Sequence, residues 1–321
     1  MKSNKEFNNV KFNFWEMIRI IITAYGEPKA TERAINALLS QKIRERYEIL
    51  VVDPFPKVEK YIKKKFGKSE KVRFYRDVGE GKAFVLNILL SKYFSENEKD
   101  IFIFTDGDVY VSKNSVNALL AKFKDPKIGC VTGHPVSINS REEKYGYFSH
   151  VAFDGAHNLR KRLSKEGKFF ECSGYLFAIR NGVISEFPLD CSEDSIIPFL
   201  FWQKGYKIAY SEDAKVHVIN PTNFQDYVTQ KVRNIKGHEN LNKYFKLPNA
   251  PPRTKSFMNE IREGFFFTLL YPGNLREFVW TIQLYALRLY IYYKAFKELR
   301  RGKGYSDGWR ETEIKSTKPF D

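Results

Sequence analysis

The sequence predicts an α/β protein, with a mostly parallel sheet covered by helices on both faces, followed by a helical, aromatic-rich C-terminal region. Between residues 18 and 133, short apolar segments typical of buried strands alternate with segments whose apolar residues recur at helical spacing. Strands and helices that alternate in this way usually form a parallel sheet with helices on both faces. After a proline-rich break at 247–253, the chain continues in segments rich in Phe, Tyr and Leu.

The predicted elements follow one another in a regular order. Expected strands are the runs IRIIITA, YEILVVD, KVRFYR, DIFIFTD and IGCVTG, at 18–24, 47–53, 71–76, 100–106 and 128–133. Expected helices lie at 28–41, 58–66, 79–94 and 115–123. Pro28 suits a first helical turn, and a mixed region extends from the last of these strands to about residue 218. Within the third helix, Leu86 is expected in the core and Asn87 in a hydrogen bond to a loop.

Composition restricts the partners and the compartment. The 321 residues contain 54 Lys and Arg against 38 Asp and Glu, a formal net charge of +16, which favours nucleic acid, anionic lipid or phosphorylated substrates. The three cysteines are far apart and cannot all pair, which favours a reducing compartment. The first 16 residues lack the apolar run of a signal peptide, so we expect a cytoplasmic protein.

Polar residues follow four of the predicted strands, where a parallel sheet binds its ligands. Tyr25 and Glu27 follow the first strand, and Asp53 ends the second. The segment Gly79-Glu80-Gly81-Lys82 precedes the third helix, and Asp106-Gly107-Asp108 follows the fourth strand. Because these strand ends meet at one edge of a sheet, the sequence predicts a shared pocket.

Asp106 and Asp108 are the predicted metal ligands. Two carboxylates on a turn after a buried strand suit a hard divalent cation, Mn²⁺ or Mg²⁺, that also binds phosphate oxygens. A solvated Asp-Gly turn is the alternative interpretation.

Two helix starts carry further candidates. Lys82 lies where helix N-terminal amides favour an anion, and it could bind a diphosphate or be an ordinary exposed lysine. The segment 191–194 precedes an apolar helix, and its acids either cap that helix or supply a general base.

Read in order, these elements resemble glycosyltransferase family 2, whose members share the GT-A fold. The resemblance runs from about Ile18 to Gly237. IIITAYGEP resembles the opening strand and its Tyr-Asn-Glu turn, with Gly26 in place of Asn, and ILVVD resembles the strand that ends in an Asp contacting the nucleobase. GKAFVLN, DGD, FECSGYLFAIR and SED followed by KGYKIAY resemble the later motifs, and DGD corresponds to the Asp-x-Asp motif.

A last motif, Gln230-Lys231-Val232-Arg233-Asn234, resembles the Gln-x-x-Arg-Trp motif of membrane-bound, often processive, members. Asn234 stands where that motif has a tryptophan thought to carry the acceptor sugar. A surface helix with scattered polar residues is the alternative interpretation of this segment.

The resemblance implies an inverting, metal-dependent glycosyltransferase with Asp194 as the catalytic base. The donor would be a nucleotide-diphosphate sugar such as a UDP- or GDP-sugar, and the acceptor a lipid-linked group or a glycan. Implied donor contacts come from Tyr25, Glu27, Asp53, Lys82, Asp106, Gln230 and Arg233. The expected divisions are an arm at 1–16, a catalytic domain at 17–220 with nucleotide-binding (17–110) and acceptor (111–220) halves, and a helical, membrane-associating region at 221–321. His217 is a weaker candidate for an additional metal ligand.

The segment Leu275 to Phe296 raises the question of a membrane. It is long enough to span a bilayer but contains Arg276, Glu277 and Arg288 among other polar residues. Its Trp and Tyr with flanking Lys and Arg favour a helix lying in the interface, at the cytoplasmic face, over a core helix or a spanning one. The tail GWRETE at 308–313 resembles the Trp-x-x-Thr tail of related synthases.

Two other functions fit part of the pattern. A sugar-phosphate nucleotidyltransferase shares the parallel core but needs a glycine-rich loop after the first strand, where TAYGEPKA has one glycine. A basic nucleic-acid-binding protein fits the charge but leaves the ordered carboxylates unexplained, so nucleic acid is not expected as a partner.

Overall fold

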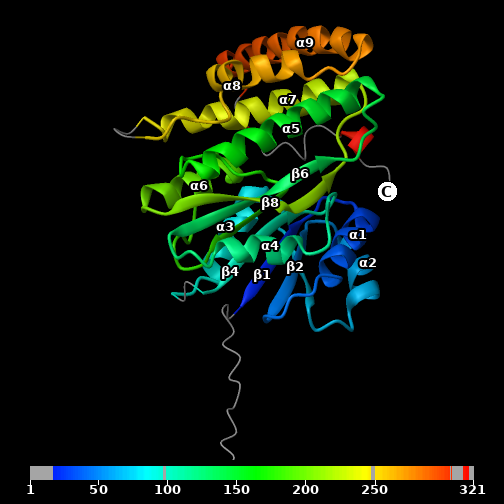
Figure 1. Cartoon of the computed structure of the whole chain (residues 1–321). Helices are drawn as coiled ribbons and strands as arrows, with labels where there is room; N and C mark the ends of the chain where they lie inside the picture. The colour runs from blue at the N-terminus through cyan, green and yellow to red at the C-terminus, as the bar shows by residue number, and fades with distance from the viewer. Residues whose placement is uncertain (1–16, 97–98, 247–249, 304, 306–313, 318–321) are drawn as a thin grey trace, which may run out of the picture.

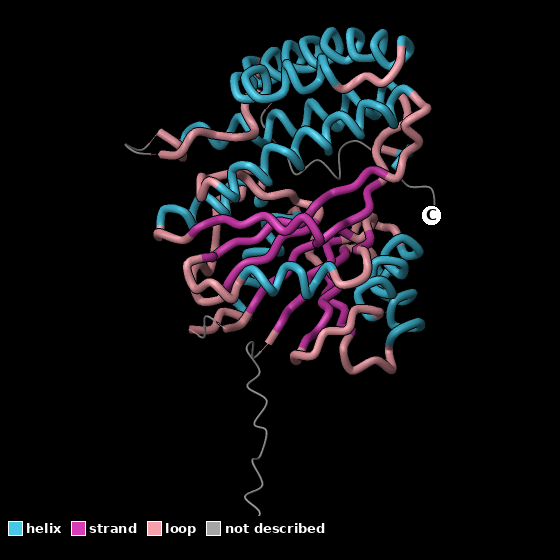
Figure 2. The backbone as a smooth tube through the Cα atoms, in the orientation of Figure 1, coloured by secondary structure: helices cyan, strands magenta, loops and turns pink. Residues whose placement is uncertain are grey.

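A computed structural model of the chain describes residues 17–96, 99–246, 250–303, 305 and 314–317. Eight strands form one sheet in the order β3-β2-β1-β4-β7-β6-β8-β5. Helices cover the sheet, and a separate helical layer lies beyond one side of it (Figures 1 and 2). The predicted N-terminal arm and the segment 308–313 lie outside the described residues.

The first half of the chain alternates strands and helices as predicted. It comprises β1 (Ile18–Thr23), α1 (Pro28–Leu39), β2 (Tyr47–Asp53), α2 (Pro56–Phe66), β3 (Val72–Arg76), α3 (Lys82–Lys92) and β4 (Ile101–Asp106). β1 pairs in parallel with both β2 and β4, and β2 pairs in parallel with β3. Leu86 is fully buried, and the Asn87 side chain exchanges hydrogen bonds with the Phe187 backbone, so both predictions for α3 are confirmed.

The second half is mixed. It contains β5 (Tyr110–Val111), α4 (Ser115–Lys122), β6 (Ile128–Ser137), α5 (Lys144–Lys165), β7 (Leu176–Arg180), α6 (Glu193–Gln203) and β8 (Lys207–Val218). β7 runs antiparallel to both β4 and β6, and β5 runs antiparallel to β8. After the long helix α5, the chain returns to the sheet as β7, which lies between the earlier strands β4 and β6. The periodicity of the sequence does not predict this placement.

Side-chain alternation along the strands builds two cores, one on each face of the sheet. Ile20 and Ile22 of β1 pack on the face that α1, α2 and α4 cover, whereas Ile21 packs on the face that α3 and α6 cover. This period of two is the geometry of an extended strand buried on both faces. The two cores hold the strand ends rigidly, which fixes the polar side chains that follow them.

The C-terminal helices form a third layer. α7 (Phe224–Glu239), α8 (Phe257–Leu270) and α9 (Leu275–Arg300) pack with α5, and α8 and α9 are outermost (Figure 1). The Tyr147 hydroxyl of α5 and the Thr281 hydroxyl of α9 share a fully buried 2.6 Å hydrogen bond. None of the described helices is both long enough and apolar enough to cross a bilayer.

Replacing Tyr147 with Phe tests how α9 is held. The change should lower the free energy of unfolding by about 1–3 kcal/mol, because it leaves the Thr281 hydroxyl buried without its partner. Chemical denaturation measures the change, with Tyr145→Phe on the same helix as the control. A Tyr147→Phe loss no larger than that of Tyr145→Phe would contradict the prediction.

Candidate functional site

The carboxyl edge of the sheet opens into a cavity of about 310 Å³. Side chains from strand ends, from the start of α6 and from α5 and α7 line it. Among the predicted site residues, the cavity is lined by Lys82, Asp106, Asp108, Asp194, Gln230 and Arg233. Predicted site residues separated by up to 151 positions in the sequence, from Lys82 to Arg233, therefore share one pocket.

Lys82 joins two carboxylates in this cavity. Its ammonium lies 2.6 Å from Asp106 Oδ1 and 2.7 Å from Glu193 Oε1. Burial alone would lower the pKa of Lys82, but the two carboxylates raise it well above its usual value. Lys82 is therefore a firmly charged group at the start of α3, and not an ordinary exposed lysine.

Asp108 lies in a strongly acidic environment. Its Oδ1 atom is buried and has no hydrogen-bond partner within the part of the chain that the structure describes. Burial and the nearby charges of Asp106 and Glu27 raise the pKa of Asp108 to about 7. A carboxylate that is buried, unsatisfied and repelled by its neighbours suits a bound cation, because the cation would remove all three costs.

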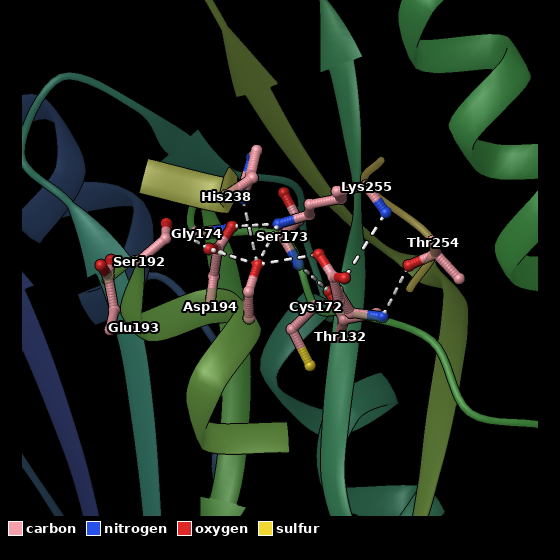
Figure 3. Close-up of polar contacts among 12 residues, drawn as sticks. Thr132, Cys172, Ser173, Gly174, Ser192, Glu193, Asp194, His238, Thr254 and Lys255 are labelled. Atoms are coloured by element: carbon pink, nitrogen blue, oxygen red, sulfur yellow. Dashed lines mark hydrogen bonds and ion pairs between the residues drawn. The ribbon is translucent and has the colours of Figure 1, made fainter. Parts of the chain in front are cut away.

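In contrast to Asp108, Asp194 has hydrogen-bond donors at both of its carboxylate oxygens. Its Oδ2 accepts hydrogen bonds from the Gly174 amide at 2.9 Å and from Lys255 Nζ at 2.6 Å, and its Oδ1 accepts one from Ser192 Oγ at 2.7 Å (Figure 3). Lys255 is the largest of the effects that hold the pKa of Asp194 below its usual value against the opposing effect of burial. Asp194 is therefore ionised and fixed in orientation.

Three further predicted residues lie at the neighbouring strand ends. Asp53 is fully buried, and its oxygens accept hydrogen bonds from the backbone amides of Gly26 at 2.8 Å and Phe55 at 2.7 Å. The Tyr25 ring meets the Phe55 ring edge-on, with centroids 5.0 Å apart. Glu27 is buried close enough to Asp108 to raise its pKa. The convergence seen for Asp106, Asp108 and Asp194 does not include Asp53, whose carboxylate closes a turn.

The geometry explains one departure from the family motif. Gly26 adopts a φ of +75°, a left-handed conformation that glycine and asparagine tolerate better than other residues. The replacement of Asn by Gly therefore keeps the turn that brings the Gly26 amide to Asp53.

The structure adds residues that sequence reasoning missed. Lys255 follows the proline-rich break, and nothing in its sequence context indicates that it pairs with Asp194. His238 lies near the same carboxylate, with Nδ1 3.4 Å from Ser195 Oγ, and burial and Lys255 lower its pKa to about 4 (Figure 3). Ile314 and Thr317 of the tail also line the cavity.

His217, the weaker candidate for a metal ligand, lies within β8. Its Nε2 is 2.8 Å from Ser112 Oγ, and its ring stacks on Tyr110. These contacts give His217 a structural role. Among the described residues, no group of three or more His, Cys, Asp or Glu side chains is placed to hold a metal.

Comparisons with solved structures show the fold. The chain aligns with a mannosyltransferase, PcManGT from Pyrobaculum calidifontis, whose structure contains GDP-Man and Mn²⁺. The TM-score is 0.57 at 17% identity, and the alignment covers 89% of this chain and 82% of that one. The fold is therefore GT-A, with a helical C-terminal region, as predicted.

The sequence relatives match only part of this chain and a smaller part of their own length. The hyaluronan synthase of Streptococcus pyogenes is 29% identical over 92 residues, which are 28% of this chain and 22% of that protein. An N-acetylglucosaminyltransferase of Rhizobium meliloti (strain 1021) is 24% identical over 170 residues, which are 49% of this chain and 38% of that protein. The chain therefore matches well under half the length of these relatives.

A family model agrees with the motifs and with the site. The model described as glycosyl transferase family 2 matches residues 19–187, more than half of the chain. The matched range contains Lys82, Asp106 and Asp108, which the structure brings into one cavity. The chain belongs to glycosyl transferase family 2.

Proposed function

We propose that the chain is a metal-dependent inverting glycosyltransferase that moves a sugar from a nucleotide-diphosphate sugar to an acceptor hydroxyl or phosphate. One observation carries the proposal: a single cavity joins the acidic pair Asp106 and Asp108 to the ionised carboxylate of Asp194. The pair Asp106 and Asp108 suits a cation and a diphosphate, and the carboxylate of Asp194 suits an acceptor. Family membership favours this function over a nucleotidyltransferase or a nucleic-acid-binding protein.

Asp108 and Asp106 are the proposed ligands of Mn²⁺ or Mg²⁺. The buried, unsatisfied Oδ1 of Asp108 supports the fit, as does the Mn²⁺ in the structure of the mannosyltransferase. Diphosphate oxygens and water would complete the coordination around these two carboxylates. A bound divalent cation would offset negative charge on the departing nucleoside diphosphate.

The donor is held, in this proposal, by the residues on the Lys82 side of the cavity. Lys82 holds Asp106 in place and adds positive charge, and the Arg233 guanidinium suits a forked contact with phosphate oxygens. Gln230 has a buried Oε1 that no other described residue contacts by a hydrogen bond, and this oxygen suits a donor hydroxyl. Tyr25, Glu27 and Asp53 would shape the nucleoside end from the adjoining turns.

Asp194 is the proposed general base for a hydroxyl acceptor. Its ionised state provides the proton acceptor, and its contacts with Gly174 and Ser192 orient the carboxylate. Attack from the face opposite the departing diphosphate would invert the anomeric configuration, as in inverting glycosidases.

Membrane-surface association is also part of the proposal. Twelve of the eighteen exposed large hydrophobic residues in the described chain lie on α8 and α9, the outermost helices. Exposed Arg262 and Arg276 accompany them. Apolar side chains mixed with arginines suit helices that lie on an anionic lipid surface.

Asp108→Asn should separate the metal role from folding. In the metal-free protein the raised pKa of Asp108 implies stability that is fully present below about pH 4 and lost as pH rises through 7. The variant should therefore melt at a higher temperature than the natural protein at pH 8, with a gap that narrows at pH 5. In the variant, Mn²⁺ should no longer strengthen UDP or GDP binding.

Thermal melting across pH and calorimetric titration of UDP and GDP, with and without Mn²⁺, measure both effects. Asp213→Asn, at an exposed position of β8, is the matched control. Unchanged Mn²⁺-dependent nucleotide affinity in Asp108→Asn would remove the metal assignment.

Asp194→Asn should leave donor binding nearly normal and lower transfer to a hydroxyl acceptor by about a hundred- to ten-thousand-fold, because the amide cannot take up the proton. Single-turnover transfer assays and donor titrations give the two quantities. Asp190→Asn, four residues upstream, controls for charge loss in the same segment. Substantial residual transfer by a folded Asp194→Asn protein would rule out the base.

A further inference from the structure

A second and larger cavity adjoins the donor cavity. Its volume is about 940 Å³, and side chains of α5, α7, α8 and α9 line it. Aliphatic and aromatic side chains dominate its lining, among them Leu159, Phe257, Leu284 and Tyr292. An apolar chamber of this size inside the helical layer suits a hydrocarbon chain.

The two cavities meet at a shared set of side chains. Six residues line both: Ala152, Ala156, Lys231, Asn234, His238 and Lys255. Four of them are polar, and two carry ammonium groups, so cations mark the point where the apolar chamber reaches the catalytic pocket. The low pKa of His238 leaves it neutral at pH 7, and the positive charge of the junction therefore comes from the two lysines.

We propose, building on the glycosyltransferase function above, that the acceptor is a long-chain lipid with a phosphate head group. Its hydrocarbon chain occupies the cavity between α5, α7, α8 and α9, and its phosphate lies at the junction against Lys231 and Lys255.

The charge at the junction supports an anionic head group. Lys231 packs against the Tyr227 ring, with Nζ 5.4 Å from the centroid. Desolvation and the charge of Arg288 outweigh the opposing charge of Glu260 and lower the pKa of Lys231 to about 8, so its positive charge is only partly compensated where it lies. A phosphate would supply the missing negative charge. A neutral glycan would not supply this charge and would gain little from an apolar chamber.

The position of Lys255 places the head group beside the chemistry. Its Nζ is 2.6 Å from Asp194 Oδ2, so an anion that contacts this lysine lies next to the proposed acceptor-side carboxylate. Asn234 lies at the same junction, where the related motif has a tryptophan. The smaller side chain leaves room for a path between the two cavities.

The chamber also reaches the outer face of the protein. Four of its lining residues are exposed apolar side chains of α8 and α9: Ile261, Phe265, Ile282 and Leu289, with exposed fractions of 45%, 43%, 51% and 62%. A lipid could therefore enter from a membrane surface in contact with these helices, without its chain crossing water.

Two variants test the two ends of the site. Gly264 faces the chamber, and a Cβ added there would meet only Glu260 Cγ, at 3.9 Å, so Gly264→Trp fills the chamber without a backbone clash. Met258→Trp, at an exposed position of the same helix outside the chamber lining, is the matched control. Lys231→Met removes the charge but keeps the stem, and Lys64→Met on α2 is its control.

The experiment first measures direct binding of farnesyl phosphate, isopentenyl phosphate and farnesol to the full chain, with no donor present. Farnesyl phosphate should bind at least about tenfold more tightly than either the short phosphate or the uncharged alcohol. Gly264→Trp and Lys231→Met should each weaken its binding by about tenfold or more, whereas the two control variants should not.

Transfer assays with UDP-glucose, UDP-N-acetylglucosamine and GDP-mannose complete the test, with farnesyl phosphate and a soluble chitooligosaccharide as competing acceptors. Preferential glycosylation of farnesyl phosphate supports the proposal. Equal binding of the long and short phosphates, unchanged binding in Gly264→Trp, or transfer to the chitooligosaccharide alone would overturn it. If farnesyl phosphate binds as expected but no nucleotide sugar is bound or consumed, the glycosyltransferase function fails and the lipid site stands.

Discussion

The site depends on one ammonium group shared between two carboxylates. Lys82, at the first turn of α3, neutralises Asp106 at the end of β4 and Glu193 at the start of α6. Burying these acids without a counter-charge would cost several kcal/mol for each ion. The ion pairs therefore tie the parallel half of the sheet to the mixed half, at the edge where the cavity opens. Asp108 keeps a buried oxygen without a hydrogen-bond partner among the described residues, and this oxygen suits a metal.

Much of the fold was predictable because local patterns determine it. Strands buried on both faces read as apolar runs, and the helices between them show apolar residues at helical spacing. The antiparallel placement of β7 was not predictable, because it depends on where a chain segment inserts between distant strands. Lys82, Asp106, Asp108 and Asp194 were identified by motif order, and the structure brings these four side chains together.

The remainder of the site lay beyond sequence reasoning for a physical reason. Lys255 and His238 matter through their proximity to Asp194, 61 and 44 residues away, and neither belongs to a recognisable motif. Asp53 lies at the expected strand end, but its carboxylate accepts hydrogen bonds from the backbone amides of Gly26 and Phe55. A motif position therefore does not determine what the side chain contacts.

Helix α5 lines both cavities, and this shared wall limits how the two cavities can evolve. Ala152 and Ala156 lie one turn apart and line the polar and the apolar chamber at once. Both methyl groups therefore lie where the two chambers adjoin. Enlarging either alanine would narrow both chambers together, so through this helix the shapes of the two chambers cannot change independently during evolution.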